Sequence, residues 1–195
     1  MDRRHLLAGI AGLSFASAAF AQTAQPQSST QAGGAAIVGT ASGTQAFGQA
    51  EQRWLQQTMM VGSVALQTSE IALQKAEDEE VKQFAKFEAD EQKGLAEVLR
   101  SMLEPAGTAS PQVGAGAAQP DQKHAAMIQK LQQAKAGDAF DKEYVKGQLD
   151  GHRELLQIEE SFLQARPQSR EAMNVAKLAA GRIREHIEML EDLQG

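Results

Sequence analysis

The sequence predicts an all-α protein, built as an antiparallel four-helix bundle. Apolar residues make up 42% of the 195 residues but aromatic residues only 5%, so the core must consist mainly of aliphatic side chains and alanine. Apolar residues recur at three- and four-residue steps over four long stretches, which is the spacing of amphipathic helices. No stretch shows the alternation of β-branched and polar residues that is typical of strands.

The first 21 residues have the composition of a signal peptide. Arg3 and Arg4 precede a short run of apolar and small residues, and Ala19 and Ala21 are the small residues expected before a cleavage site at Ala21. The run is shorter than the roughly 20 apolar residues that span a bilayer, so a membrane anchor is not favoured. The paired arginines also resemble a twin-arginine export signal. We therefore expect an exported, periplasmic protein whose mature chain begins at Gln22.

A polar tether is predicted over residues 22–48, which are rich in Gln, Ser, Thr, Gly and Ala. Such a segment buries too little apolar surface to offset the entropy of ordering, so it should be flexible. The bundle domain is expected over residues 50–195. A formal net charge of −6 does not suit a nucleic acid partner. The absence of cysteine excludes disulfides, thiolate metal sites and thiol catalysis.

Two long helices are predicted after the tether, joined by a tight turn. The first covers about residues 50–76. Its apolar stripe consists of Leu55, Met59, Leu66 and Leu73. The second covers about residues 79–103, with Asp78 as its N-cap and Pro105 ending it. Its inward side chains are predicted to be Val81, Phe84, Phe87, Leu95, Val98, Leu99 and Met102.

The second pair of long helices follows a Gly-, Pro- and Ser-rich connection, residues 105–121, and a short helix over about 122–135. Gly137 is predicted to end the short helix, and Asp138 to cap a third long helix that stops before Pro167. The fourth covers about residues 170–193, capped by Ser169. Its inward side chains are predicted to be Val175, Leu178, Ala179, Ile183, Ile187 and Leu190. Four helices of about 25 residues with one long connection match a ferritin-like crossover, and a plain up-and-down bundle is the alternative.

Polar residues within the apolar stripes are the candidates for chemistry. His152 and His186 lie on the stripes of the third and fourth long helices. Both fall near mid-height when counted from the turn between those helices, so we expect their imidazoles to meet across the core. They should do so directly or through Glu91, Tyr144 or a water. Bundle proteins assemble metal sites from carboxylates and imidazoles in this way.

Other titratable residues on these helices are assigned to solvent. Glu70 and Glu88 lie within the apolar stripes and could point inward, as candidate ligands, but a small rotation of the first and second helices would place them on solvated flanks, which is the interpretation we favour. His124, on the short helix, is predicted to be exposed. An interior histidine is more often bonded to a carbonyl or carboxylate than to a metal, so His152 and His186 also suit a purely structural network.

A set of short motifs runs in order through the four long helices. They are Ile71-Ala72-Leu73 with Lys75-Ala76, Val81-Lys82 with Phe84-Ala85, Phe140-Asp141 with Tyr144, Gln148 with His152, and Glu185-His186. Together they resemble a bacterial ferritin-like family, domain of unknown function 4142, over about Gly62 to Leu193. The resemblance implies an exported helical bundle behind a signal peptide and a tether, and it implies no activity. The chain departs from the family at Asp90-Glu91, where Asp-His is usual, and at Ala65, where a glutamate is frequent.

Two functions of different classes follow. The one we rank first is a non-enzymatic exported bundle that acts in protein interaction or envelope stress, with an unidentified protein or a second copy as partner and no cofactor. The alternative is a bundle that binds a divalent metal, iron or zinc, through His152, His186 and Glu91. Ferroxidase activity is not expected, because the sequence lacks the Glu-x-x-His motifs of di-iron bundles. Hydrolysis has no support, since there is no Gly-x-Ser-x-Gly elbow.

Overall fold

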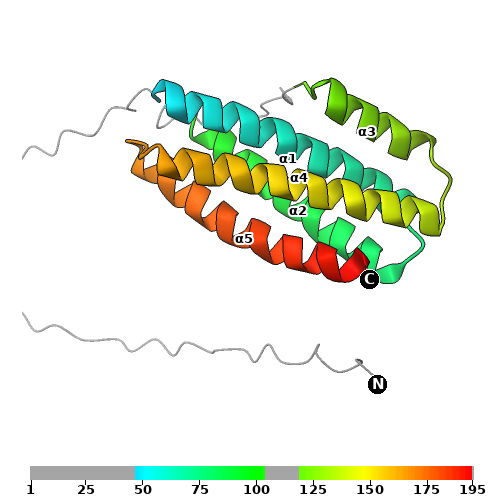
Figure 1. The fold of residues 1–195 in the computed structure, drawn as a ribbon. Helices are drawn as coiled ribbons and strands as arrows, with labels where there is room; N and C mark the ends of the chain where they lie inside the picture. Colours follow the sequence, from blue (N-terminus) through cyan, green and yellow to red (C-terminus); the bar gives the residue numbers. More distant parts are fainter. Residues whose placement is uncertain (1–46, 104–118, 195) are drawn as a thin grey trace, which may run out of the picture. The chain divides into compact units, whose positions relative to one another are not determined.

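The computed structural model describes residues 47–103 and 119–194, and these are all-helical, with five helices and no strand. The helices are α1 (Gln49–Lys75), α2 (Glu79–Ser101), α3 (Gln122–Gln133), α4 (Asp138–Gln164) and α5 (Arg170–Gln194) (Figure 1). Every helix end lies within two residues of its prediction. The predicted signal peptide, and all of the predicted tether except its last two residues, lie outside the described residues.

Local sequence explains where the helices begin. Asp78 caps α2, because its Oδ1 accepts hydrogen bonds from the amides of Glu80 and Val81 at 2.8 and 3.2 Å. Ser169 likewise accepts from an amide in the first turn of α5 at 3.1 Å. The start of α4 differs from the prediction. Gly137 stands at its N-cap with a φ of 127°, a conformation that favours glycine, and Asp138 is already helical.

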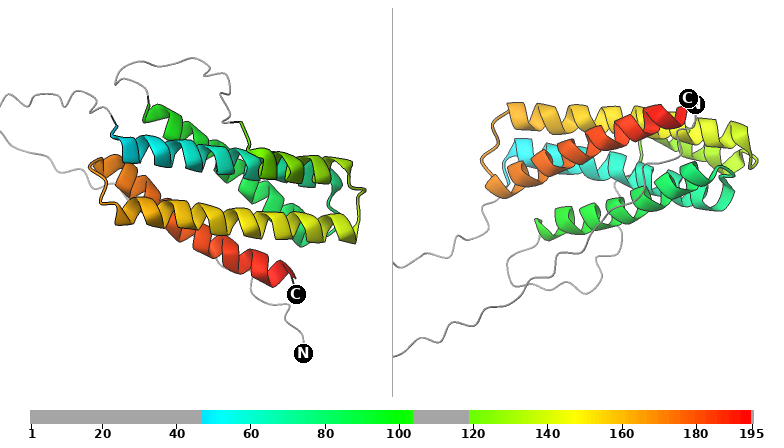
Figure 2. Two further views of the ribbon diagram at one scale, coloured as in Figure 1. Left: turned by 45° about the horizontal axis from the view of Figure 1, so that its top comes forward. Right: turned by 90° about the horizontal axis from the view of Figure 1, so that it is seen from below.

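Hydrogen bonds at the helix ends show the relative directions of α1, α2 and α4. Asp141, in the first turn of α4, accepts from the amide of Asp78 in the α1–α2 turn at 2.8 Å. At the opposite end, Glu51 near the start of α1 accepts from the amide of Gln168 in the α4–α5 turn at 2.9 Å. Helices α2 and α4 therefore start at the same end and run parallel, while α1 runs antiparallel to both (Figure 2).

The interior consists of three apolar clusters along the length of the helices. One contains Phe84, Phe140 and Tyr144, and another contains Trp54 stacked on Phe162 with ring centroids 4.5 Å apart. The third is made by Val61, Leu155 and Ile183. Within the described part of the chain, no helix combines the length and apolar character needed to cross a bilayer.

Four side chains predicted to point inward are exposed instead. They are Leu73, Phe87, Val98 and Leu178, of which Leu178 is the most exposed at 77%. On α2 the buried face follows Phe84, Glu88 and Gln92, which are spaced four residues apart. The apolar residues of α2 therefore indicated the wrong centre for its buried face, and the helix is rotated so that Glu88 faces the core.

We expect Leu149→Ala and Ile183→Ala each to lower the free energy of unfolding by about 2–5 kcal/mol, because both side chains are buried and truncation leaves a cavity. Leu178→Ala, at the exposed position of α5, should change it by no more than about 0.5 kcal/mol. Urea unfolding of the three variants measures this. A costly Leu178→Ala or a silent Leu149→Ala would contradict the orientation of these helices.

Candidate metal centre

Three helices each bring one polar side chain to the same point in the core. Glu88 comes from α2, His152 from α4 and His186 from α5, and their exposed fractions are 0%, 1% and 2%. The predicted meeting of the two imidazoles is confirmed, because His152 Nε2 lies 3.2 Å from His186 Nδ1. The placement of Glu88 on a solvated flank is wrong, since this carboxylate is the third member of the cluster.

One atom of each side chain faces the others. Glu88 Oε2 lies 2.9 Å from His186 Nδ1 and 3.4 Å from His152 Nε2. These are ion-pair distances, yet Oε2 has no hydrogen-bond partner among the described residues, because neither ring nitrogen is directed toward it as a donor. Three potential ligand atoms thus converge, and one of them is a buried oxygen whose hydrogen-bonding capacity is unused.

The outward atoms of the cluster are held by further hydrogen bonds. His152 Nδ1 lies 2.8 Å from the main-chain oxygen of Gln148, an acceptor, so Nδ1 carries the proton and Nε2 keeps its lone pair in the neutral ring. Gln92 donates to the other oxygen of Glu88 at 3.0 Å. Such contacts fix the orientation of metal-binding side chains and the tautomer of histidine ligands.

Glu91, the carboxylate predicted to join the two histidines, lies at the edge of the cluster. Its Oε2 is 3.6 Å from His186 Nε2, the ring nitrogen that faces away from Glu88. The same oxygen accepts from Arg182 Nε at 2.7 Å. Because Glu88 lies on the buried face of α2 and Glu91 on its flank, Glu88 occupies the place that was predicted for Glu91, and Glu91 can orient the ring of His186.

Glu88 and His152 shift each other's pKa in opposite directions. Burial by itself would raise the pKa of Glu88, but the charge of His152 and the nearby imidazole of His186 outweigh burial and bring this pKa well below its usual range. Burial would lower the pKa of His152, and the Glu88 carboxylate outweighs it, so this pKa is raised. In the absence of a metal, the same interaction thus favours the ionised form of Glu88 and the protonated form of His152.

The remaining candidates lie apart from this cluster. Glu70 is exposed, as predicted, and pairs with Lys93 at 3.1 Å. The prediction for His124 is wrong, since only 3% of it is exposed and its Nδ1 lies 2.8 Å from an oxygen of Asp121, the N-cap of α3. Its spacing of four and seven residues from the buried Ile128 and Leu131 is the signal that places it on the covered face.

A second buried carboxylate, Glu159 on α4, was not identified from the sequence. It accepts from Trp54 Nε1 at 2.7 Å and from Thr58 Oγ1 at 2.9 Å. Burial, only partly offset by these two donors, raises its pKa to about 7. Its spacing from the buried Leu155 and Phe162 would have indicated this position, because all three residues share one face of α4.

Comparison with known proteins places the chain among helical domains. The model of the family described as "Domain of unknown function (DUF4142)" matches residues 37–193. No curated protein matches the chain significantly.

Three solved structures are similar in fold. A DUF305 fragment from Deinococcus radiodurans has a TM-score of 0.61 at 15% identity and covers 76% of this chain and 97% of its own. A DUF305 protein from Streptomyces coelicolor, whose description proposes secretion, has a TM-score of 0.58 at 16% identity, covering 74% and 89%. CopM in its Cu(II)-bound form has a TM-score of 0.56 at 18% identity, covering 74% and 95%. At these identities the likeness concerns the fold alone.

We expect Glu159→Gln to remove a pH dependence of stability. Between the ordinary pKa of 4.5 and the folded value of about 7, the folded state binds more protons than the unfolded state, so stability falls as pH rises, by up to about 3 kcal/mol. Glutamine keeps an oxygen that can accept from Trp54 Nε1 and an NH2 group that can donate to the Thr58 hydroxyl, but it cannot ionise. The test compares urea unfolding of both proteins between about pH 4.5 and pH 7, followed by fluorescence of Trp54, the only tryptophan. Identical slopes for the two proteins would show that Glu159 does not titrate in this range.

Proposed function

The chain belongs to the DUF4142 family, and from this premise we propose that it is an exported, non-enzymatic protein that binds one divalent metal ion between Glu88, His152 and His186. The proposal keeps both histidines of the metal hypothesis and replaces Glu91 with Glu88 as the third ligand. We further propose that its four long helices form an antiparallel bundle with a ferritin-like crossover between α2 and α4.

The spacing of the three ligand atoms carries the proposal. A metal bound at about 2.0–2.1 Å in tetrahedral geometry requires its ligand atoms to be about 3.3–3.4 Å apart. The distances among Glu88 Oε2, His152 Nε2 and His186 Nδ1 are 2.9, 3.2 and 3.4 Å, close to one face of such a tetrahedron. The ligands therefore need to move by only a few tenths of an ångström to bind an ion.

The hydrogen bonds around the cluster support the same function. The unpartnered oxygen of Glu88 would cost about 1–3 kcal/mol if nothing satisfied it, and a cation would satisfy it. The contact of Gln148 with His152 Nδ1 directs the lone pair of Nε2 toward the cluster. Glu91 stands beside the outer nitrogen of His186, which is the position of the orienting carboxylate in many histidine metal sites.

Two imidazoles and one carboxylate are suitable donors for zinc, iron(II) and copper(II). Zinc and iron follow from the residue types. Copper is added because one structural neighbour, CopM, is described in a Cu(II)-bound form, although at 18% identity this neighbour supports only the choice of test metals.

A non-enzymatic role is supported by the burial of all three ligands. Their exposed fractions of 2% or less leave no ligand surface open to a substrate, whereas catalytic metal sites keep an accessible coordination position. Export to the periplasm is supported by the composition of residues 1–21. The paired arginines favour the twin-arginine route, which would carry the folded protein with its metal already bound.

We expect metal to stabilise the protein through the two histidines. At about 100 times its dissociation constant, zinc should raise the free energy of unfolding of the metal-free protein by about 2.7 kcal/mol, and His152→Gln and His186→Gln should each abolish this gain. His124→Gln is the matched control, because His124 is also buried but lies outside the cluster. Urea unfolding with and without zinc, copper(II) or iron(II) makes the measurement. No gain in the wild-type protein, or an equal gain in His152→Gln, would leave the cluster as a metal-free ion pair.

Two glutamate variants separate ligand from supporting residue. Glu91→Gln should weaken metal binding by about 10–100-fold, the usual effect of losing a residue that orients a ligand, whereas Glu88→Gln should weaken it further because a ligand is lost. Competition with a chromophoric chelator gives both affinities. The opposite ranking would assign the ligand role to Glu91.

A further inference from the structure

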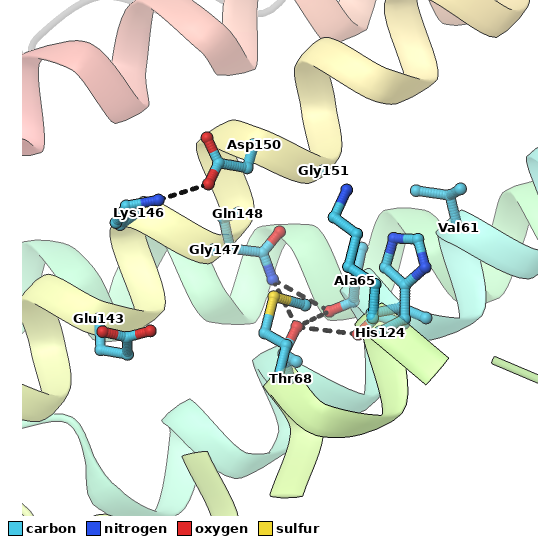
Figure 3. A pocket seen from close by; sticks show the side chains of 13 residues that line it. Val61, Ala65, Thr68, His124, Glu143, Lys146, Gly147, Gln148, Asp150 and Gly151 are labelled. Carbon is cyan, nitrogen blue, oxygen red and sulfur yellow. Dashed lines mark hydrogen bonds and ion pairs between the residues drawn. The ribbon is translucent and has the colours of Figure 1, made fainter. Parts of the chain in front are cut away.

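Helix α3 covers the four long helices only between α1 and α4. It packs against both of them, and Ala65 of α1, His124 of α3 and Gly147 of α4 line a common pocket there (Figure 3). In the described part of the chain, no helix covers α2 and α5 in this way. The outer side chains of α2 and α5 therefore face solvent or a partner molecule.

An ion pair joins α2 to α5. Arg182 Nε of α5 donates to Glu91 Oε2 of α2 at 2.7 Å, so these two residues mark where the helices face each other. The turn over residues 165–169 reverses the chain, and α5 runs antiparallel to α4 (Figure 1). Because α4 runs parallel to α2, helices α2 and α5 are antiparallel.

Each of these two helices carries one exposed apolar residue four positions before its ion-pair residue and one seven positions after it. They are Phe87 and Val98 on α2 and Leu178 and Met189 on α5, with exposed fractions between 40% and 77%. At about 100° per residue, both offsets turn a side chain by about 20–40° to the same side of the ion-pair residue. Since the helices are antiparallel, all four side chains lie on one outer face, which we call the α2–α5 face.

The buried ligands confirm which side of the ion pair is the outer one. Glu88 lies three positions before Glu91, and His186 lies four positions after Arg182. These offsets turn both side chains by about 40–60° in the opposite sense, toward the core, where both are buried. The apolar residues of the α2–α5 face therefore point away from the metal centre.

Two glycines lie near the middle of the α2–α5 face. A Cβ at Gly94 or at Gly181 would meet no atom within 4 Å, so no contact inside the chain requires glycine at either position. Glycine destabilises a helix interior relative to alanine, and it allows another backbone to approach closely. The face thus has apolar side chains toward its ends and small residues near its centre, a shape that suits packing by another helix.

The spacing of the face matches a second copy of the same chain. On each helix the two apolar residues are 11 positions apart, which is about 16.5 Å. A two-fold axis parallel to the helices places α2 of one copy on α5 of the other. Phe87 then lies beside Met189 of the second copy at one end, and Val98 lies beside Leu178 of the second copy at the other.

The charges at the centre of the face select this arrangement. Glu91 lies opposite Arg182 of the second copy, so opposite charges meet on both sides of the axis. A two-fold axis perpendicular to the helices would instead place Glu91 on Glu91, and like charges would repel. Spacing and charge therefore agree on one self-complementary pairing.

We propose that two copies of the chain form a symmetric dimer through the α2–α5 face, with α2 of each copy packed against α5 of the other. The four apolar residues supply the buried surface, and the two ion-pair residues set the register. This proposal does not depend on a bound metal, because none of the four apolar residues is a ligand.

Sedimentation equilibrium of the purified full chain measures the assembly directly. A dimer is expected at about 100 μM, without larger species, because a two-fold interface uses the same face of both copies and is then closed. A monomer at this concentration would overturn the proposal and leave the face to a different partner. Open-ended association would overturn it as well.

Three glutamate variants locate the interface. Phe87→Glu and Leu178→Glu should each weaken dimerisation by more than about 100-fold, because the substitution puts an unpaired carboxylate into an apolar contact twice in each dimer. Leu73→Glu is the matched control, since Leu73 is 43% exposed, close to the 45% of Phe87, but lies on α1 outside the face. It should dimerise as the wild-type protein does.

A dimer that persists in both face variants, or an equal loss in Leu73→Glu, would overturn the assignment. Because all three positions are exposed, the variants should keep the helical circular dichroism of the wild-type protein. Zinc affinity measured on the same samples tests the metal centre separately, so that failure of one proposal is distinguished from failure of the other.

Discussion

A carboxylate that stays ionised without contact with solvent needs a positive charge beside it, and Glu88 meets this condition only because two imidazoles reach it from other helices. The cost of burying an unpaired charge is high, so α2, α4 and α5 are constrained to a register in which Glu88, His152 and His186 meet. The same constraint applies whether the positive charge is a proton shared with His152 or a bound metal ion.

Helix α1 supplies no ligand, but a chain of hydrogen bonds connects it to the cluster. His152 is held by the main-chain oxygen of Gln148, and the side chain of Gln148 donates to Thr68 and Ser69 on α1. Tyr144, one turn before Gln148, also bonds Ser69 at 2.9 Å. The central part of α4 therefore connects α1 to the cluster, and a change at Gln148 would disturb both sets of hydrogen bonds.

The sequence predicted those features that depend on neighbours along the chain. Helix ends were predicted because their signals are local, such as the N-cap Asp78 and the cap Ser169. The meeting of His152 with His186 was predicted because antiparallel helices keep a fixed rise per residue from their common turn. The rotation of α2 was not predicted. Phe87 is apolar and exposed, while Glu88 is charged and buried, and that reversal depends on partners from α4 and α5 that the sequence of α2 does not contain.

The metal-free ion pair and the metal centre differ in whether an ion lies between the three side chains, which diffraction can observe. In an ion pair, an imidazole N–H points at Glu88 Oε2, whereas in a metal centre the lone pairs of all three ligand atoms point at one ion. The most direct test is therefore anomalous diffraction at the zinc edge from crystals of the zinc-loaded protein. The proposed function predicts a single peak in the core, about 2.0–2.1 Å from Glu88 Oε2, His152 Nε2 and His186 Nδ1. An anomalous map of the zinc-loaded crystals that shows no peak at this position, whether or not zinc is bound elsewhere, would contradict the proposed function.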